Sequence, residues 1–391
     1  PMLVCTKIGR ATEKCLTFDP PGCYRAPNEI NRDGYNIIPT IAKPPMGRDH
    51  PIVHEALHTV TNGEQARTWL RILNGYARPS TSRSVAELAV TVVPLIALWV
   101  AMVASLQFGY WIALLLSVPA AGLLVRLFLI QHDCGHYSFF KSRWANDLVG
   151  RFIGVFTLTP HAYWRNAHAI HHATSGNLDR REIGGVEVVT VREYRAMSRW
   201  QRLSYRLYRN PLVMLGMGPT YLFVLKFRLP LDMLHGRHKV LMSVMATNLA
   251  IFAVIVLVGL VIGFTELAMV QVPITMIASS IGVWLFYVQH QFENVYWSEN
   301  KDWDFHQAAV EGSSFFDLPW GMRWFTANIG VHHVHHLCSR IPHYRLQACL
   351  KQIPELREVN RITLQGSLKT LRLALWDEER RRMVGFRALR Q

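Results

Sequence analysis

Eight of the 18 histidines in this 391-residue chain fall in three short motifs whose spacing suits metal binding. On a helix, residues three and four positions apart share a face, so each motif presents two or three imidazoles toward one point. Neutral imidazole is the commonest metal ligand in proteins. The motifs are "HDCGH" (His132, His136), "HAIHH" (His168, His171, His172) and "HHVHH" (His332, His335, His336). Three such motifs in one chain predict a metal site.

The number of imidazoles favours two metal ions over one, because a zinc site uses only three or four protein ligands. The first motif has Asp-Cys-Gly in its middle and lacks the glutamate of the HExxH motif of zinc proteases. Imidazole suits zinc, copper, iron and nickel alike, so the spacing leaves the identity of the metal open.

Long apolar segments must position these motifs. Half of the residues are hydrophobic and only 18% are charged. No Lys or Arg occurs in residues 84–125 or 240–300. A helix needs about 20 apolar residues to cross the ~30 Å core of a bilayer, so each window holds two such helices. We predict two helical hairpins, with four membrane spans at residues 88–106, 110–130, 244–264 and 267–288.

Four crossings place all three histidine motifs on one side of the membrane, in a helical cap. The hairpin turns at 107–109 and 264–266 carry no Lys or Arg, and the positive-inside rule then puts the basic cap in the cytoplasm. Apolar segments at 148–158 and 211–225 are shorter than a span and are predicted to be interfacial or re-entrant. The expected fold is an all-α integral membrane protein whose cytoplasmic cap carries a dimetal site.

The net charge of +15 raises the question of nucleic-acid binding. The sequence has no zinc-finger spacing, aromatic RNA-binding signature or basic heptad helix, so no nucleic-acid partner is predicted. A histidine-rich membrane metal transporter is a remote alternative. It would need ionisable groups inside its spans, and Leu88–Leu106 and Val244–Phe264 contain none.

Longer phrases around the motifs resemble the membrane fatty acid desaturases, specifically the acyl-lipid type of bacteria and plastids. These phrases are "HDCGHYSFF", "WRNAHAIHHATSGNLDRRE", "VQHQFENVYW" and "EGSSFFDLPWGMRWFTANIGVHHVHHLCSRIPHYRL". The resemblance covers a desaturase domain (41–355). The residues before it (1–40) lack hydrophobic periodicity and are expected to form a mobile tail, and those after it (356–391) a basic cytoplasmic segment. The resemblance implies four membrane helices, two non-haem iron ions and the O2-dependent formation of a cis double bond in an acyl-lipid.

The resemblance also implies nine metal ligands, namely the eight motif histidines and His290, which follows the fourth apolar segment. The nine are His132, His136, His168, His171, His172, His290, His332, His335 and His336. The chain has no HPGG haem motif, so the electrons are expected from an external donor, ferredoxin before cytochrome b5. A bacterial inner membrane is the implied location. A hydroxylase or ketolase of the same superfamily is the alternative activity, because it would use the same motifs.

Other polar residues near the motifs have open roles. His161 and His333 are expected to serve the structure and not the metal, and a packing role is expected for His343. Acidic side chains could orient histidine rings or make ordinary polar contacts; they are Asp133, Asp179 and Glu311. Aromatic side chains could line an acyl tunnel or form a membrane-interface belt; they are Trp284, Phe286, Tyr287, Trp297, Trp303, Phe315, Phe316 and Trp324.

Overall fold

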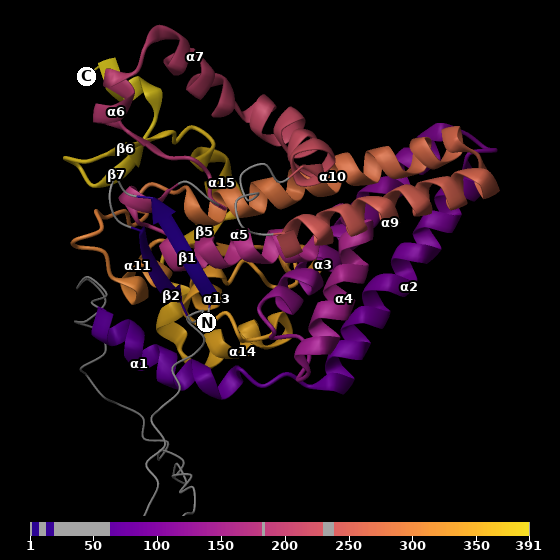
Figure 1. Cartoon of the computed structure of the whole chain (residues 1–391), viewed down its shortest axis with the longest axis horizontal. Coiled ribbons are helices and arrows are strands. Elements are labelled where there is room, and N and C mark those ends of the chain that lie inside the picture. Colours follow the sequence, from indigo (N-terminus) through magenta and orange to yellow (C-terminus); the bar gives the residue numbers. More distant parts are fainter. Residues whose placement is uncertain (1, 8–12, 19–62, 182–183, 230–237, 391) are drawn as a thin grey trace, which may run out of the picture.

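The computed structural model describes residues 2–7, 13–18, 63–181, 184–229 and 238–390. Within them, four helices are long and apolar enough to cross a membrane. They are α2 (Thr81–Ser105), α3 (Tyr110–Gly135), α9 (His238–Ile262) and α10 (Phe264–His290). The four helices extend to one side of the molecule in two hairpins, with α4 packed among them and most of the other short elements at the other side (Figure 1). This arrangement confirms the predicted fold class.

The helices are longer at their cap ends than the predicted spans. α2 begins at Thr81 and α9 at His238, whereas α3 continues to Gly135. At the opposite ends both hairpin turns are tight. Gly109 has a φ of 143° and Gly263 a φ of 100°, a backbone conformation that glycine adopts without a steric penalty.

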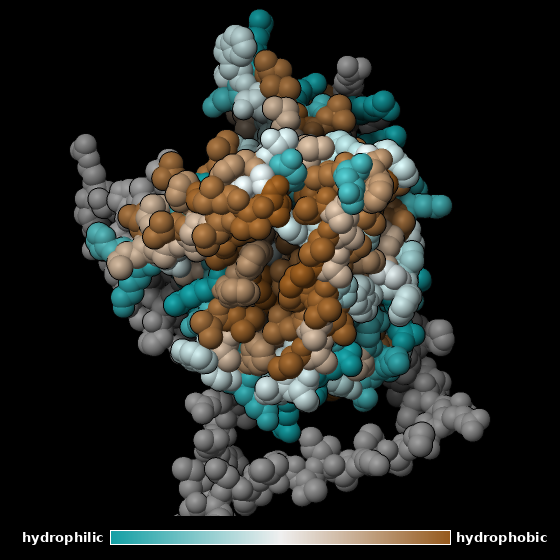
Figure 2. All heavy atoms as spheres, turned by 90° about the vertical axis from the view of Figure 1, so that its right-hand side faces the viewer, coloured by the Kyte–Doolittle hydropathy of each residue, from teal (hydrophilic) through white to brown (hydrophobic). Residues whose placement is uncertain are grey.

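The outer faces of the hairpins are apolar (Figure 2). Among the exposed side chains are Val93, Leu115, Leu249 and Val261, whose exposed fractions range from 63% to 83%. A continuous apolar surface of this kind suits lipid and not water. The helices satisfy their own backbone hydrogen bonds, as a membrane-spanning segment must. The chain is therefore a multi-pass membrane protein.

α3 is the central helix of the bundle and packs against both α2 and α10, while α9 packs against α10. α4 (Arg143–Phe156) covers α3 and α9. The main apolar core lies between these helices and includes Ile130, Ile153, Ile274 and Val288. The predicted short segment 148–158 falls largely in α4, and 211–225 is a run of π-helical and α-helical turns. Neither segment is among the candidate spans.

The cap is built from short helices and strands. Its further helices are α1 (Gly63–Leu73), α5 (His161–Thr174), α6 (Val191–Ala196), α7 (Arg199–Tyr208), α8 (Gly218–Thr220), α11 (Phe305–Glu311), α12 (Trp320–Phe325), α13 (His332–Leu337), α14 (His343–Gln352) and α15 (Leu364–Thr370). Its strands are β3 (Val189–Thr190), β4 (Phe315–Asp317), β5 (Arg361–Thr363), β6 (Leu375–Asp377) and β7 (Arg382–Val384). A second apolar cluster joins α1, α11, α13 and α14.

The last residues of the chain pair with the middle of the cap. β5 runs parallel to β4, with Phe315 opposite Arg361. β6 lies between β3, to which it is parallel, and β7, to which it is antiparallel. In the predicted tail, the described residues are only β1 (Met2–Lys7) and β2 (Glu13–Phe18), which pair antiparallel. The other tail residues lie outside the described part of the chain.

Candidate metal centre

Four helices converge on the cap side and carry the predicted histidines. α3 carries His132, and His136 is the residue that follows its last turn. α5 and α13 carry the other two motifs, and α10 ends on His290. The start of α5 is tied to α3, because the Gln131 side chain donates to the Thr159 backbone oxygen at 2.8 Å. The motifs are therefore held by the cap ends of the membrane helices and by two short helices packed on them.

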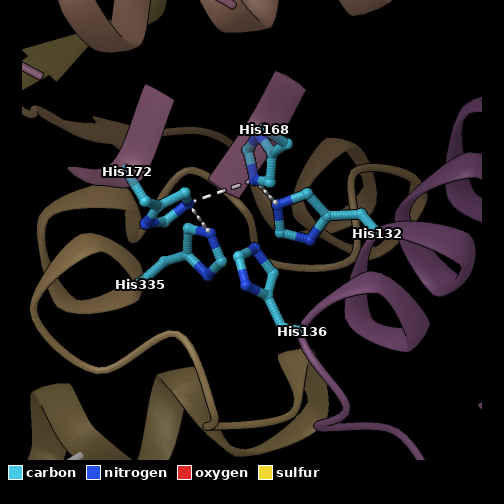
Figure 3. Close-up of side chains that lie close together, drawn as sticks. All are labelled: His132, His136, His168, His172 and His335. Atoms are coloured by element: carbon cyan, nitrogen blue, oxygen red, sulfur yellow. Dashed lines mark hydrogen bonds between the residues drawn. The ribbon is translucent and has the colours of Figure 1, made fainter. Parts of the chain in front are cut away.

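Five of the nine histidines form one group (Figure 3). Its members are His132, His136, His168, His172 and His335, whose candidate ligand nitrogens all lie within 4.8 Å of one another. The Nε2 atoms form a chain in which neighbours are 3.0 Å (His132–His168), 3.1 Å (His168–His172) and 3.1 Å (His172–His335) apart. The His136 ring points into the same centre (Figure 3), and its Nε2 is buried without a hydrogen-bond partner among the described residues.

The remaining four histidines form a second group, His171, His290, His332 and His336. The Nε2 of His290 lies 3.0 Å from that of His171 and 2.9 Å from that of His332. On its other side, the His290 ring places Nδ1 3.1 Å from the Gly312 carbonyl oxygen. Donation of the Nδ1 hydrogen to this carbonyl leaves the Nε2 lone pair free to bind a metal.

The two groups adjoin each other. The rings of His172 and His336, one from each group, stack with centroids 4.1 Å apart. Burial, together with neighbouring histidines, lowers the pKa of seven of the nine histidines well below its ordinary value. These are His136, His168, His171, His172, His332, His335 and His336. These seven imidazoles are therefore neutral, the protonation state that binds metals.

Hydrogen bonds alone cannot account for the spacing of these nitrogens. A neutral imidazole nitrogen either carries one hydrogen or offers one lone pair, yet the Nε2 of His168 and that of His172 each approach two other Nε2 atoms. Nitrogens about 3 Å apart are spaced like adjacent ligands that lie about 2.1 Å from one ion. A metal ion in each group fits the residues present.

The structure also separates the histidines that were expected to lie outside the centre. His333 turns away from both groups, and its Nε2 lies 2.8 Å from the Leu356 carbonyl oxygen. His161 is buried under Gly150, where a Cβ atom would meet its ring at 2.4 Å, and its Nε2 lies 3.9 Å from Asp147. Neither residue belongs to a described metal-binding group.

A buried network of charges beside the five-histidine group escaped the sequence analysis. Asp133 accepts hydrogen bonds from the backbone N–H and the ring Nδ1 of His343, both at 2.8 Å. The His343 Nε2 lies 3.7 Å from Glu87 of α2, and Glu87 pairs with Arg126 of α3. The Asp133 carboxylate also lies 3.6 Å from the His132 Nδ1. His343 thus does more than pack: it links Asp133 to the ion pair between two membrane helices.

The sequence gives only a weak indication of this buried network. Glu87 stands one residue before the predicted first span, and Arg126 interrupts the second apolar segment. Ionisable residues at such positions rarely remain buried without a partner. The sequence does not reveal that the partner of Glu87 is Arg126, 39 positions further along the chain.

The other candidate orienting groups make different contacts. Asp179 accepts a hydrogen bond from the Asn300 backbone at 2.7 Å, and Glu311 accepts one from the Gln307 side chain at 3.0 Å. Among the aromatic residues, Phe286 places its ring 5.1 Å from that of His171 and 5.3 Å from that of His290. The four-histidine group therefore has an apolar wall on the α10 side.

Comparison with known proteins agrees with this arrangement. The sequence model of the family described as "Fatty acid desaturase" matches residues 108–364. A fatty acid desaturase of Bacillus subtilis (strain 168) is 45% identical over 315 residues, which cover 81% of this chain and 89% of the relative. An sn-1 acyl-lipid omega-3 desaturase (ferredoxin) of Nostoc sp. is 30% identical over 269 residues, or 64% and 69% of the two chains.

An sn-1 oleoyl-lipid 12-desaturase of Synechocystis sp. is 28% identical over 239 residues, which cover 57% of this chain and 63% of the relative. The membrane helices, the histidine groups and these similarities define a histidine-rich membrane oxidoreductase. The chain belongs to the fatty acid desaturase family.

Proposed function

We propose that this enzyme introduces a cis double bond into the acyl chain of a membrane lipid. Two non-haem iron ions would be held by the nine histidines, one in each group. The observation that carries the proposal is the meeting of nine buried imidazoles in two adjoining groups at the ends of membrane helices. The acyl-lipid substrates named for the Nostoc and Synechocystis relatives support the same substrate class.

The reaction would consume one O2, two electrons and two protons, and would convert an adjacent pair of methylene groups into a double bond with release of two waters. The metal ions, when bound, supply the O2-dependent oxidation that no side chain can perform. The protein's own residues keep the imidazoles neutral by burial and fix their rings, as the Gly312 carbonyl does for His290. Phe286 adds an apolar surface beside the four-histidine group.

The cap would face the cytoplasm, and the membrane would be a bacterial inner membrane. The absence of Lys and Arg from both hairpin turns supports this orientation. We propose ferredoxin as the electron donor, with cytochrome b5 as the second choice, because a basic cap attracts an acidic partner. The Nostoc relative carries ferredoxin in its name. The division into tail (1–40), desaturase domain (41–355) and basic segment (356–391) remains a prediction.

The test is the lipid profile of a host that expresses the wild type, His335→Ala or His333→Gln. His335 and His333 lie on the same short helix, but only His335 belongs to a histidine group. The proposal expects a new cis double bond, located by mass spectrometry after derivatisation, with the wild type and His333→Gln but not with His335→Ala. A hydroxylated or oxo product would instead show that the chain is a hydroxylase or ketolase. Unchanged lipids in all three strains, with a ferredoxin system present, would refute the proposal.

A further inference from the structure

A second site is built on the cap, away from the histidine groups. It is a cavity of about 640 Å³, within the range of roughly 300–1,000 Å³ typical of small-molecule pockets. Four basic side chains line it, and so do two acidic ones: Arg323, Lys351, Arg357, Arg361, Asp317 and Glu358. Four positive charges against two negative charges leave a formal excess of two positive charges.

Three of the four basic side chains form no ion pair with the described residues. Arg361 donates to the Asp317 carboxylate at 2.7 Å, and the Nε of Arg357 donates to the Leu350 backbone oxygen at 3.1 Å. Among the described residues, neither Arg323 nor Lys351 forms an ion pair; the ion pairs in the cavity are those of Arg361. These cations are available to an anionic ligand.

A further lining residue, Gln347, has a buried Nε2 with no hydrogen-bond partner in the described structure. A buried amide N–H without a partner costs free energy, so such groups are usually satisfied by a ligand or by water. Together with the unpaired cations, Gln347 gives the cavity donors of hydrogen bonds and positive charge, which is the combination that binds phosphate.

The cavity lies near the level at which the apolar segments of the membrane helices end. α12 supplies the lining residues Trp320 and Trp324 and packs on α3, where a Cβ on Gly122 would meet the Phe325 ring at 2.7 Å. One turn further along α3, the Arg126 guanidinium stacks on Trp324 at 4.4 Å. Trp320 is 78% exposed, and tryptophan is enriched at the level of lipid headgroups.

Backbone hydrogen bonds link a wall of the cavity to residues that neighbour the histidine groups. β4 lines the cavity with Phe315, and the backbone N–H of Phe316 donates to the Gly330 oxygen at 2.7 Å, two residues before His332. The residue before β4, Ser314, donates its N–H to the Gln289 oxygen at 3.0 Å, next to His290. One short strand thus joins the basic cavity to two histidines of the four-histidine group.

We propose that this cavity binds the phosphate of a phospholipid headgroup, and that an acyl chain of the same lipid is the substrate. The inference rests on the proposed function for the identity of the acyl chain, but not for the binding of phosphate. Arginine binds phosphate oxygens in a planar, two-point geometry, and lysine adds a point charge. A neutral glycolipid headgroup would leave the excess charge of the cavity unpaired. The substrate class is therefore phospholipid.

The experiment measures binding of dihexanoyl phosphatidylglycerol to the purified full chain in detergent micelles by calorimetry. The proposal expects Arg323→Gln combined with Lys351→Gln to weaken binding at least tenfold. Arg199→Gln combined with Lys369→Gln, two exposed cap residues outside the cavity, is the charge-matched control and should bind like the wild type. Dihexanoylglycerol, which lacks the phosphate, should bind each protein equally weakly. Equal phosphatidylglycerol affinity in all three proteins would overturn the proposal.

Two further arms separate the possible causes of failure. If inorganic phosphate binds in the cavity as tightly as the phospholipid, the site serves a free anion and the proposal is wrong. If the cavity variant keeps its lipid affinity but loses turnover with a reduced electron donor, the surface docks a protein and the proposal is also wrong. Binding is repeated with His335→Ala, which should retain it. A failure of the desaturase function alone would leave this headgroup binding intact.

Discussion

Replacement of Glu87 by Leu tests whether the buried ion pair between α2 and α3 holds the bundle together. The Glu87 and Arg126 side chains are 5% and 3% exposed. Without Glu87, Arg126 keeps its hydrogen bonds to Thr91, at 3.1 Å, and to the Trp324 carbonyl, but it has lost its carboxylate. Removal of one partner of a buried pair costs about 3–5 kcal/mol. The free energy of unfolding should fall by this amount.

The double variant Glu87→Leu/Arg126→Met should be more stable than either single variant. It leaves no buried charge unpaired and loses the stacking of Arg126 on Trp324, worth about 0.5–2 kcal/mol. The coupling energy of the two substitutions should therefore exceed about 3 kcal/mol. The assay is unfolding of the purified protein by SDS in mixed micelles, monitored by circular dichroism, with all four members of the cycle.

The half-exposed pair between Arg382 and Glu293, with N and O 3.1 Å apart, is the matched control. Its side chains are 45% and 61% exposed, and such pairs contribute about 0–1 kcal/mol. A coupling energy between Glu87 and Arg126 as small as that of the control would refute the reasoning. It would mean that the pair is hydrated and does not stabilise the helix packing.

Three further predictions concern the cap. His333→Ala should lower the melting temperature, because it leaves a buried carbonyl without its partner, but metal content measured by mass spectrometry should stay at the wild-type level. Gly330→Ala should lower both, because a Cβ there would lie 2.3 Å from a backbone oxygen of β4; wild-type values would contradict the close approach. Burial opposes the protonation of His343, but Asp133, with Glu87 nearby, raises its pKa above 6.5. The stability this gives is present below pH 6.5 and is lost as the pH rises through the higher folded-state pKa. Thermal melts at several pH values should show this slope in the wild type and not in His343→Gln.

The main elements of the fold were predictable because their signals are local. Four long apolar stretches, in which Arg126 is the only Lys or Arg, specify four spanning helices, and the side of the membrane for each histidine motif follows from counting crossings. The cap ends of α2 and α9 were not predictable from hydropathy. There α2 continues past the apolar stretch through the buried polar residues Ser84 and Glu87, and α9 begins with two exposed polar residues, His238 and Lys239.

The sequence predicts that the nine histidines lie on one side of the membrane, but it does not predict their division into two groups. His171 and His172 are adjacent in the chain and point to different groups, as do His335 and His336. Successive residues on a helix point about 100° apart, and only the tertiary arrangement, in which the histidine rings of α5 and α13 meet, decides which histidine group each side chain joins. The basic cavity could not be predicted from the sequence for a similar reason. It forms only when β5 and α14 fold back on β4.

The most direct test of the central claim is the metal content of the purified wild type, determined by inductively coupled plasma mass spectrometry. His136→Ala and His336→Ala are measured beside it, one variant for each histidine group. We predict two iron ions per chain in the wild type, with loss of metal in both variants. A single ion per chain, a zinc content that matches the protein, or metal binding that survives both substitutions would contradict the assignment of a dimetal centre.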